Sequence, residues 1–247
     1  MKKKVLIPTK LDRIAGEVLA ATGLYEAVQD DVTPLADLAA RHRDAYALIV
    51  RSEKITAAVI DALPALKVII RAGAGYDTID TKHARRKGID VMNTPGANSN
   101  AVAEEVLALM LADARFIVPA DVSTRAGGWE KKAFMGREIA GKTVGIVGLG
   151  NIGRLVARRL SGFDCRLLGF DPVIAPERAQ DLEVALVNLE TLFKESDFIT
   201  LHVPLTDETA NMVDETLLMR MKNGATLINC ARHGIIDEAA LRRIKPQ

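Results

Sequence analysis

Three glycines behind a short apolar run are the first feature of this sequence that could bind a ligand. Gly148, Gly150 and Gly153 follow the run 144–147 at the spacing G-x-G-x-x-G, and residues 154–160 then have helical periodicity. In such a strand, loop and helix, the first glycine permits a tight turn, the second lets a pyrophosphate approach the backbone, and the third lets the helix pack closely on the strand. The free amides of the helix N-terminus then face the anion. The spacing therefore predicts a dinucleotide site.

An acidic side chain stands where the ribose of such a dinucleotide would lie. A second predicted strand, 166–170, ends at Asp171, and its separation from the glycines is close to the ~20 residues typical of this fold. A carboxylate there can accept hydrogen bonds from both ribose hydroxyls and would repel a 2′-phosphate, so the pattern favours NAD over NADP. The alternative is a glycine-rich turn of another α/β protein, in which Asp171 merely caps a loop before Pro172.

Two strand ends in the first part of the chain carry groups that could hold an anion. The predicted strand 47–50 is followed by Arg51 and Ser52, and the predicted strand 67–70 is followed by Arg71. Ligands of open α/β sheets bind at the carboxyl ends of strands. These three residues would suit a phosphate group, and they could equally be solvated charges at strand ends.

Short strands separated by helices must position these groups. The first part of the chain has five of them, at 5–7, 25–28, 47–50, 67–70 and 90–92. This alternation predicts a parallel, flavodoxin-like sheet with right-handed crossovers. The turn signal Asn93-Thr-Pro-Gly96 marks the expected boundary between a substrate-binding domain, 1–94, and an NAD-binding Rossmann domain, 95–247. The second domain has predicted strands at 144–147, 166–170, 184–186, 197–201 and 225–229.

Two of the expected helices carry apolar stripes that should face a sheet or another helix. Helix 11–21 would turn Ile14, Val18 and Leu19 inward. Helix 98–116 would be capped by Ser99 or Asn100. Its expected stripe consists of Val102, Val106, Leu109, Met110 and Ile117.

Composition excludes several classes of function. With 49% hydrophobic and 26% charged residues the chain can build real cores. A formal net charge of +1 gives no reason to expect nucleic acid or an anionic membrane as a partner, and no apolar run approaches the length of a membrane span. The short apolar stretch at the N-terminus predicts a first strand of a cytoplasmic protein rather than a signal peptide. Cys165 and Cys230 lack metal-ligand spacing and suggest a reducing compartment.

Six motifs in order resemble those of one known family. They are Arg71-Ala-Gly-Ala-Gly-Tyr-Asp-Thr-Ile-Asp80, Asn93-Thr-Pro-Gly96, Gly128-Trp-Glu-Lys-Lys-Ala-Phe-Met-Gly136, Gly148-Leu-Gly-Asn-Ile-Gly153, His202-Val-Pro-Leu-Thr206 and Asn229-Cys-Ala-Arg232, the last continued by Gly234-Ile-Ile-Asp-Glu238. The chain resembles the NAD-dependent D-2-hydroxyacid dehydrogenases, and most closely their 3-phosphoglycerate dehydrogenase branch. The resemblance runs from about Val5 to the final residue.

The resemblance implies roles for individual residues. Arg232 would be catalytic, because a guanidinium beside the nicotinamide can bind the substrate carboxylate and polarise the C2 oxygen. The backbone of Gly73, Ala74 and Gly75 would cradle that carboxylate, and Arg51, Ser52 and Arg71 would complete the substrate site. Arg232 would also touch the cofactor NAD. The other implied cofactor contacts are Gly148, Gly150, Asn151, Ile152, Gly153, Asp171, Pro172, His202, Val203, Pro204, Thr209, Cys230 and Ala231.

The resemblance also has a limit. The family's catalytic glutamate and its acid/base histidine lie on two further strands, and neither motif occurs before Gln247. His233, directly after Arg232, is a candidate substitute base. A sheet that stops after five strands exposes an apolar edge, which predicts an oligomer that covers it or a longer parent chain. We expect a homodimer through the Rossmann domain and a small 2-hydroxy or 2-oxo acid as substrate. The alternatives are an NAD(H)-binding sensor or scaffold of the same fold, or a structural protein without a ligand.

Overall fold

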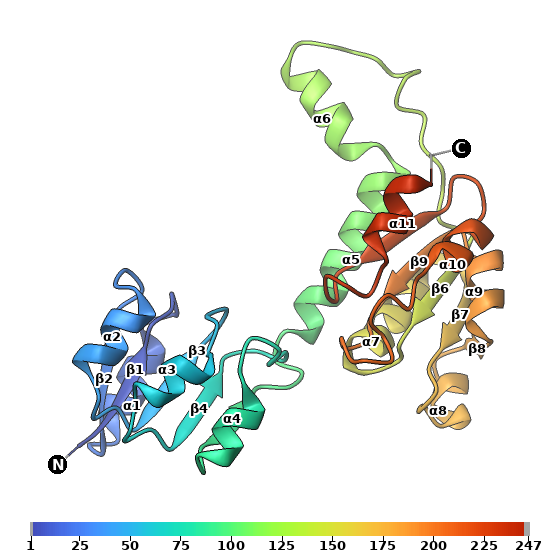
Figure 1. Ribbon diagram of the computed structural model, residues 1–247. Coiled ribbons are helices and arrows are strands. Elements are labelled where there is room, and N and C mark those ends of the chain that lie inside the picture. Colours follow the sequence, from blue (N-terminus) through green and yellow to red (C-terminus); the bar gives the residue numbers. More distant parts are fainter. Residues whose placement is uncertain (1, 245–247) are drawn as a thin grey trace. The chain divides into compact units, whose positions relative to one another are not determined.

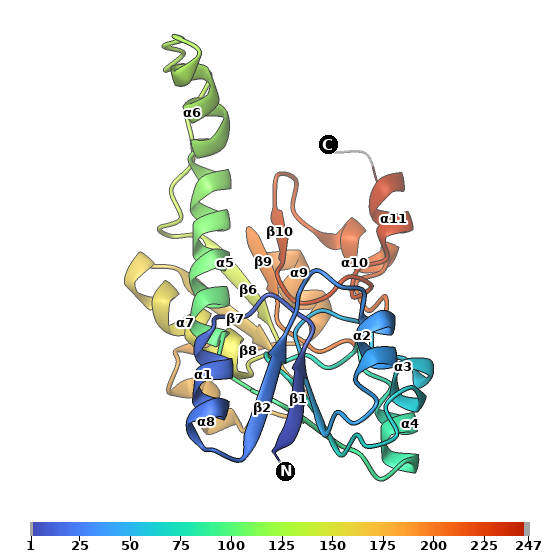
Figure 2. The same cartoon turned by 90° about the vertical axis from the view of Figure 1, so that its left-hand side faces the viewer.

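The computed structural model describes residues 2–244. The chain divides into two compact units, Met1–Asn98 (unit 1) and Ser99–Gln247 (unit 2). The expected boundary after residue 94 lies slightly before this division. Each unit is built on its own five-stranded parallel sheet with helices on both faces (Figures 1 and 2).

The sheet of unit 1 has the flavodoxin-like strand order. Its neighbouring strands are β2-β1-β3-β4-β5, all paired in parallel, which is the 2-1-3-4-5 order of that fold. The strands are β1 (Lys3–Ile7), β2 (Tyr25–Gln29), β3 (Ala47–Val50), β4 (Val68–Arg71) and β5 (Asp90–Asn93). The predicted fold class is therefore confirmed for this unit.

The helices of unit 1 bury alternate residues of the strands on two faces. Figure 2 shows α1 (Ile14–Ala21) on one face of the sheet and α2 (Leu35–Arg41), α3 (Ala57–Asp61) and α4 (Thr81–Arg86) on the other. The expected stripe of α1 was wrong for two of its three residues, because Ile14 and Val18 are 55% and 59% exposed. Leu19 does pack on the sheet, as expected, together with Leu11 and Ala15. Ala15 and Leu19 lie four residues apart on one face of the helix, and Leu11 lies in the loop just before it.

The sheet of unit 2 has the Rossmann order. The neighbours are β10-β9-β6-β7-β8, which is 3-2-1-4-5 when read from β8 and counted within the unit. The strands are β6 (Thr143–Val147), β7 (Arg166–Phe170), β8 (Val184–Leu186), β9 (Phe198–Leu201) and β10 (Thr226–Asn229). The predicted Rossmann sheet is confirmed.

Two hydrophobic clusters cover the two faces of this sheet. One includes side chains of α5 (Ser99–Ala114), α7 (Asn151–Leu160) and α8 (Pro176–Gln180). The other includes side chains of α9 (Leu189–Glu195), α10 (Glu215–Arg220) and α11 (Glu238–Arg243). A short 3₁₀ turn, Ser161–Phe163, follows α7. The buried stripe of α5 differs from the expected one: Leu109 is 46% exposed, and the helix buries Ser99, Ala103, Val106, Met110 and Ala114.

An arm, residues 116–136, projects from unit 2 and begins with α6 (Ile117–Arg125) (Figures 1 and 2). It starts where Phe116 takes the left-handed backbone conformation, φ 52°, which ends the long helix earlier than expected. Arg137 then anchors the returning chain, because its guanidinium donates hydrogen bonds to Asp113, to Thr226 and to the carbonyl of Gly224. The arm is therefore attached at its base and exposed beyond it.

Candidate functional site

Four strands of unit 2 end at the same level. Val147 of β6 is level with Phe170 of β7 and with Leu201 of β9. Leu201 is in turn level with Asn229 of β10. One position further along the strands stand four predicted site residues, Gly148, Asp171, His202 and Cys230. Four motifs far apart in the sequence therefore meet at one carboxyl edge, which is where ligands of open α/β sheets bind.

The three glycines meet three different geometric demands. Gly148 has φ +92°, and a Cβ there would lie 2.9 Å from the backbone of His202. Gly150 caps the N-terminus of α7, and nothing lies within 4 Å of where its Cβ would be. A Cβ on Gly153 would lie 2.0 Å from the carbonyl oxygen of Gly148. The turn, the open approach and the close helix contact are thus all present in the folded chain.

The carboxylate of Asp171 is fixed at the mouth of the glycine turn. The Leu149 amide donates to Oδ2 (2.7 Å), and the amides of Val173 and Ile174 donate to Oδ1 (2.8 and 3.0 Å). The last two bonds cap a loop, as the alternative interpretation of Asp171 requires. The bond from Leu149 goes beyond a loop cap, because it joins the end of β7 to the glycine turn. An ionised carboxylate has about four acceptor positions, so a ribose hydroxyl can still bind.

His202 closes the site at the end of β9. Its amide donates to the Val147 carbonyl (2.7 Å), and its Nε2 lies 3.0 Å from the Thr200 hydroxyl. Burial lowers the pKa of His202 to about 4, so the ring is neutral at pH 7. Its Nδ1 is buried and has no hydrogen-bond partner among the residues described. Sequence reasoning did not include Thr200, which orients this ring.

The turn after β10 presents Arg232. The Asn229 side chain accepts from the Ala231 amide (3.0 Å) and donates to the Arg232 carbonyl (2.9 Å), so it folds residues 229–232 into a tight turn. Arg232 Nη1 donates to the Ala231 carbonyl (2.8 Å). His233 points elsewhere, since its Nδ1 lies 2.6 Å from Oε1 of Glu238 and its side chain is 85% exposed. The sequence motif Asn229-Cys-Ala-Arg232 contains this asparagine but does not indicate that its side chain folds the turn.

Unit 1 has its own row of strand ends. Arg71 of β4 is level with Val50 of β3, and the Ala72 amide donates to the Val50 carbonyl (2.7 Å). Gly73 has φ +147°, and a Cβ there would collide with the guanidinium of Arg71. The predicted substrate residues of β3 and β4, namely Arg51, Ser52, Arg71, Gly73, Ala74 and Gly75, therefore share one edge of this sheet. Sequence reasoning missed Glu53, which directly follows Ser52.

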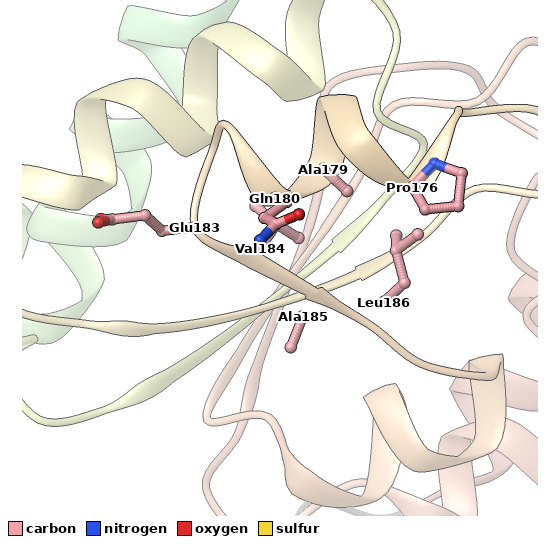
Figure 3. Close-up of a pocket in the computed structure, with 7 residues that line it drawn as sticks. All are labelled: Pro176, Ala179, Gln180, Glu183, Val184, Ala185 and Leu186. Atoms are coloured by element: carbon pink, nitrogen blue, oxygen red, sulfur yellow. The ribbon is translucent and has the colours of Figure 1, made fainter.

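A surface hollow of about 360 Å³ lies elsewhere in unit 2, between α8 and the edge strand β8 (Figure 3). Figure 3 shows Glu183 pointing away from the other side chains of the hollow. None of the predicted site residues lines it; the lining residues are Pro176, Ala179, Gln180, Glu183, Val184, Ala185 and Leu186.

The residues at the carboxyl edge of unit 2 fit an adenine dinucleotide. The backbone at Gly150 is open to an approaching group, because nothing lies within 4 Å of a Cβ placed there, and the Asp171 carboxylate beside the glycine turn is a hydrogen-bond acceptor. Within residues 2–244 no group of histidine, cysteine and acidic side chains could hold a metal ion. The same residues contain no helix that is long and apolar enough to cross a bilayer.

Comparison with known proteins identifies the family. Residues 107–244 match the family described as "D-isomer specific 2-hydroxyacid dehydrogenase, NAD binding domain". The chain belongs to this family. The match covers most of unit 2, so the carboxyl edge described above is that of an NAD-binding domain, as the resemblance implied.

Individual relatives agree with this assignment. The chain is 51% identical over 195 residues to a hydroxypyruvate reductase of Thermotoga maritima, covering 78% of this chain and 63% of that protein. It is 44% identical over 246 residues to a D-3-phosphoglycerate dehydrogenase of Synechocystis, covering 96% of this chain and 43% of that protein. It therefore spans about half the length of the curated relatives it matches. The structure of a D-lactate dehydrogenase from Aquifex aeolicus, complexed with NAD and lactic acid, superposes with a TM-score of 0.84 at 28% identity, covering 98% of this chain and 72% of that one.

Proposed function

We propose that this chain provides the substrate-binding and NAD-binding parts of a D-2-hydroxyacid dehydrogenase, which transfers a hydride between C2 of a small 2-hydroxy acid and NAD. The observation that carries the proposal is the level row of strand ends in unit 2. It brings the glycine turn, Asp171, His202 and the Arg232 turn to one edge of the sheet. The fold alone would not support a function, but this row supplies the specific groups that a dinucleotide needs.

The residues of unit 2 divide the binding task. NAD, when bound, supplies the hydride acceptor. The amides of the glycine turn, with Asn151 and Ile152 at the start of α7, would hold the pyrophosphate. Asp171 and Pro172 would hold the adenosine ribose, and the turns after β9 and β10 would line the rest of the cofactor. The residues of these two turns that would contact the cofactor are Val203, Pro204, Thr209, Cys230 and Ala231.

Each unit, taken by itself, offers groups that could bind a substrate carboxylate. Arg232 is the cation that would bind the carboxylate and polarise the C2 oxygen. In unit 1, the Ala74 and Gly75 amides have no acceptor among the described residues, and such amides can converge on a carboxylate. The relatives named hydroxypyruvate reductase and D-3-phosphoglycerate dehydrogenase suggest a three-carbon acid.

Cofactor binding is tested with Asp171→Ala and its matched control Asp181→Ala, which removes an acid at the end of α8. Titration calorimetry with NADH should show at least a tenfold (~1.4 kcal/mol) loss of affinity for the first variant only. Unchanged affinity in Asp171→Ala would contradict the proposed site. Hydride transfer is followed by nicotinamide absorbance with hydroxypyruvate and D-lactate. NADH binding without turnover would support a sensor or scaffold role.

We also infer that the chain forms a homodimer through unit 2, in a reducing compartment such as the cytoplasm. The arm carries apolar side chains that monomers rarely expose together, namely Phe116, Ile117, Val118, Val122, Trp129 and Met135. The two cysteines are free thiols. Light scattering should report a dimer that Val122→Asp disrupts. Val32→Asp, at an 88% exposed position of unit 1, is the control that should leave it intact. A wild-type monomer would refute this inference.

A further inference from the structure

An internal carboxylate occupies the end of β3 in unit 1, where a phosphate site was one of the expectations. Oε2 of Glu53 accepts hydrogen bonds from the amides of Arg51 (2.8 Å) and Ser52 (3.1 Å). Successive backbone amides of this kind are the donors that bind phosphate in many proteins. The chain therefore fills this set of anion-binding donors with one of its own side chains.

The charge of this carboxylate is retained at neutral pH. Burial of Glu53 opposes its ionisation, but hydrogen bonds from the Arg51 amide, the Thr9 hydroxyl and the Ser52 amide outweigh it, so the pKa of Glu53 lies below its ordinary value. Thr9 follows β1, which pairs with β3, and is only 5% exposed. Glu53 is thus held from its own turn and from the neighbouring strand. The end of β3 presents a fixed negative charge.

The end of the neighbouring strand β4 has the opposite character. Arg71 brings a positive charge level with Val50. The Ala74 and Gly75 amides that follow have no acceptor within the described part of the chain, whereas those of Arg51 and Ser52 are taken. This edge of unit 1 can therefore accept one carboxylate at β4. A phosphate of the same substrate, placed at the end of β3, would lie against the negatively charged carboxylate of Glu53.

We propose that Glu53 determines substrate specificity by excluding phosphorylated acids, so that the substrate is an unphosphorylated 2-hydroxy or 2-oxo acid. This inference rests on the proposed function, because it concerns the same substrate. A phosphate at the end of β3 must either displace Glu53 from the two amides or lie beside it with the same sign of charge. Both lower affinity, since like charges brought together in a binding site act against the wrong partner. An uncharged hydroxyl at that end of the substrate meets neither penalty.

The test compares D-glycerate with 3-phospho-D-glycerate, which differ only in the phosphate. Each is titrated calorimetrically into the NADH-loaded chain, in wild type, Glu53→Gln and Glu53→Ala. Glutamine keeps an acceptor for the two amides and removes the charge, whereas alanine releases the amides as well. Glu17→Gln, on exposed α1, makes the same change in net charge away from the strand ends.

The proposal expects wild type to bind D-glycerate at least about tenfold more tightly than 3-phospho-D-glycerate. Glu53→Gln should raise the affinity for the phosphorylated acid about tenfold, with a change below about threefold for D-glycerate, and Glu53→Ala should raise it further. Glu17→Gln should behave as wild type. Wild-type preference for the phosphorylated acid, or an unchanged ratio in Glu53→Gln, would overturn the inference and leave the proposed function standing. A wild-type chain that binds neither NADH nor either acid would overturn both.

Discussion

The roles of two glycines at the start of α7 can be distinguished by replacing each with alanine, because an added methyl group would meet different surroundings at the two positions. At Gly150 the new Cβ would enter open space, while at Gly153 it would lie 2.0 Å from the Gly148 carbonyl oxygen. Gly150→Ala should therefore affect the ligand and Gly153→Ala should affect the fold. The pair tests whether the open space at Gly150 is where the pyrophosphate lies.

The magnitudes follow from the local geometry. Gly150 has φ −71° and ψ −155°, which alanine can adopt. Alanine restricts the unfolded chain and so raises the free energy of unfolding by about 0.4–1 kcal/mol, but it is a poorer N-cap residue and lowers that free energy by a similar amount. The net change in unfolding free energy should stay within about 1 kcal/mol. In Gly153→Ala, the gain in helix propensity of about 1 kcal/mol is exceeded by overpacking against a backbone carbonyl, typically 1–3 kcal/mol or more. We expect a net loss of about 2 kcal/mol.

The assays are urea unfolding followed by circular dichroism and calorimetric titration with NADH. Gly150→Ala should unfold like wild type and bind NADH at least tenfold (~1.4 kcal/mol) more weakly. Gly162→Ala is the control for both measurements, because its Cβ would also meet nothing within 4 Å but lies beyond the end of α7. NADH affinity at the wild-type level in Gly150→Ala would refute our placement of the pyrophosphate. Wild-type stability in Gly153→Ala would refute the role of close helix packing.

Three further predictions concern stability and the candidate base. Because burial lowers the pKa of His202 from 6.5 to about 4, the unfolded chain takes up this proton first as the pH falls. The contribution of the neutral ring to stability is complete above pH 6.5, and about 3 kcal/mol of it is lost towards pH 4. The free energy of unfolding in urea should therefore fall as the pH falls across this range, and His202→Gln should remove this dependence. An equal dependence in the variant would contradict the assignment to His202. Arg137→Gln should lower the free energy of unfolding by about 1–2 kcal/mol and speed tryptic cleavage of the arm, because hydrogen bonds at the base of the arm are lost. Wild-type stability and cleavage in this variant would contradict the anchoring role. His233→Ala should keep any turnover that the wild type shows, because the ring faces Glu238 and solvent; complete loss would revive His233 as a base.

Much of the fold could be predicted because its signals are local. Short apolar runs such as 144–147 indicate buried parallel strands, and their alternation with helices limits the possible sheets to a few. The glycine spacing predicted a tight turn at Gly148, an open backbone at Gly150 and close packing of the helix at Gly153, and the structure has each of these features. These features depend on residues near one another in the chain, so the sequence alone was sufficient for them.

The errors arose where neighbouring elements decide which side chains are buried. The stripes expected for α1 and α5 followed helical periodicity, but periodicity does not fix which of two adjacent apolar rows faces the sheet. Ile14 and Leu109 were left exposed, and Ala103 and Ala114 were buried instead. Phe116 ended the long helix through a backbone conformation that its residue type does not signal.

The amino acids alone were enough to predict the two sheets, the glycine turn and the acid that follows β7. The folded chain was needed to show that Asp171 reaches the Leu149 amide, that four strand ends stand level, and that Glu53 accepts from the amides of Arg51 and Ser52. Strand register and side-chain hydrogen bonds depend on partners far away in the sequence or on the path of a turn, and neither can be predicted from residue types alone. The sequence lists the hydrogen-bonding groups of the chain, and the fold shows which of them already have a partner within it.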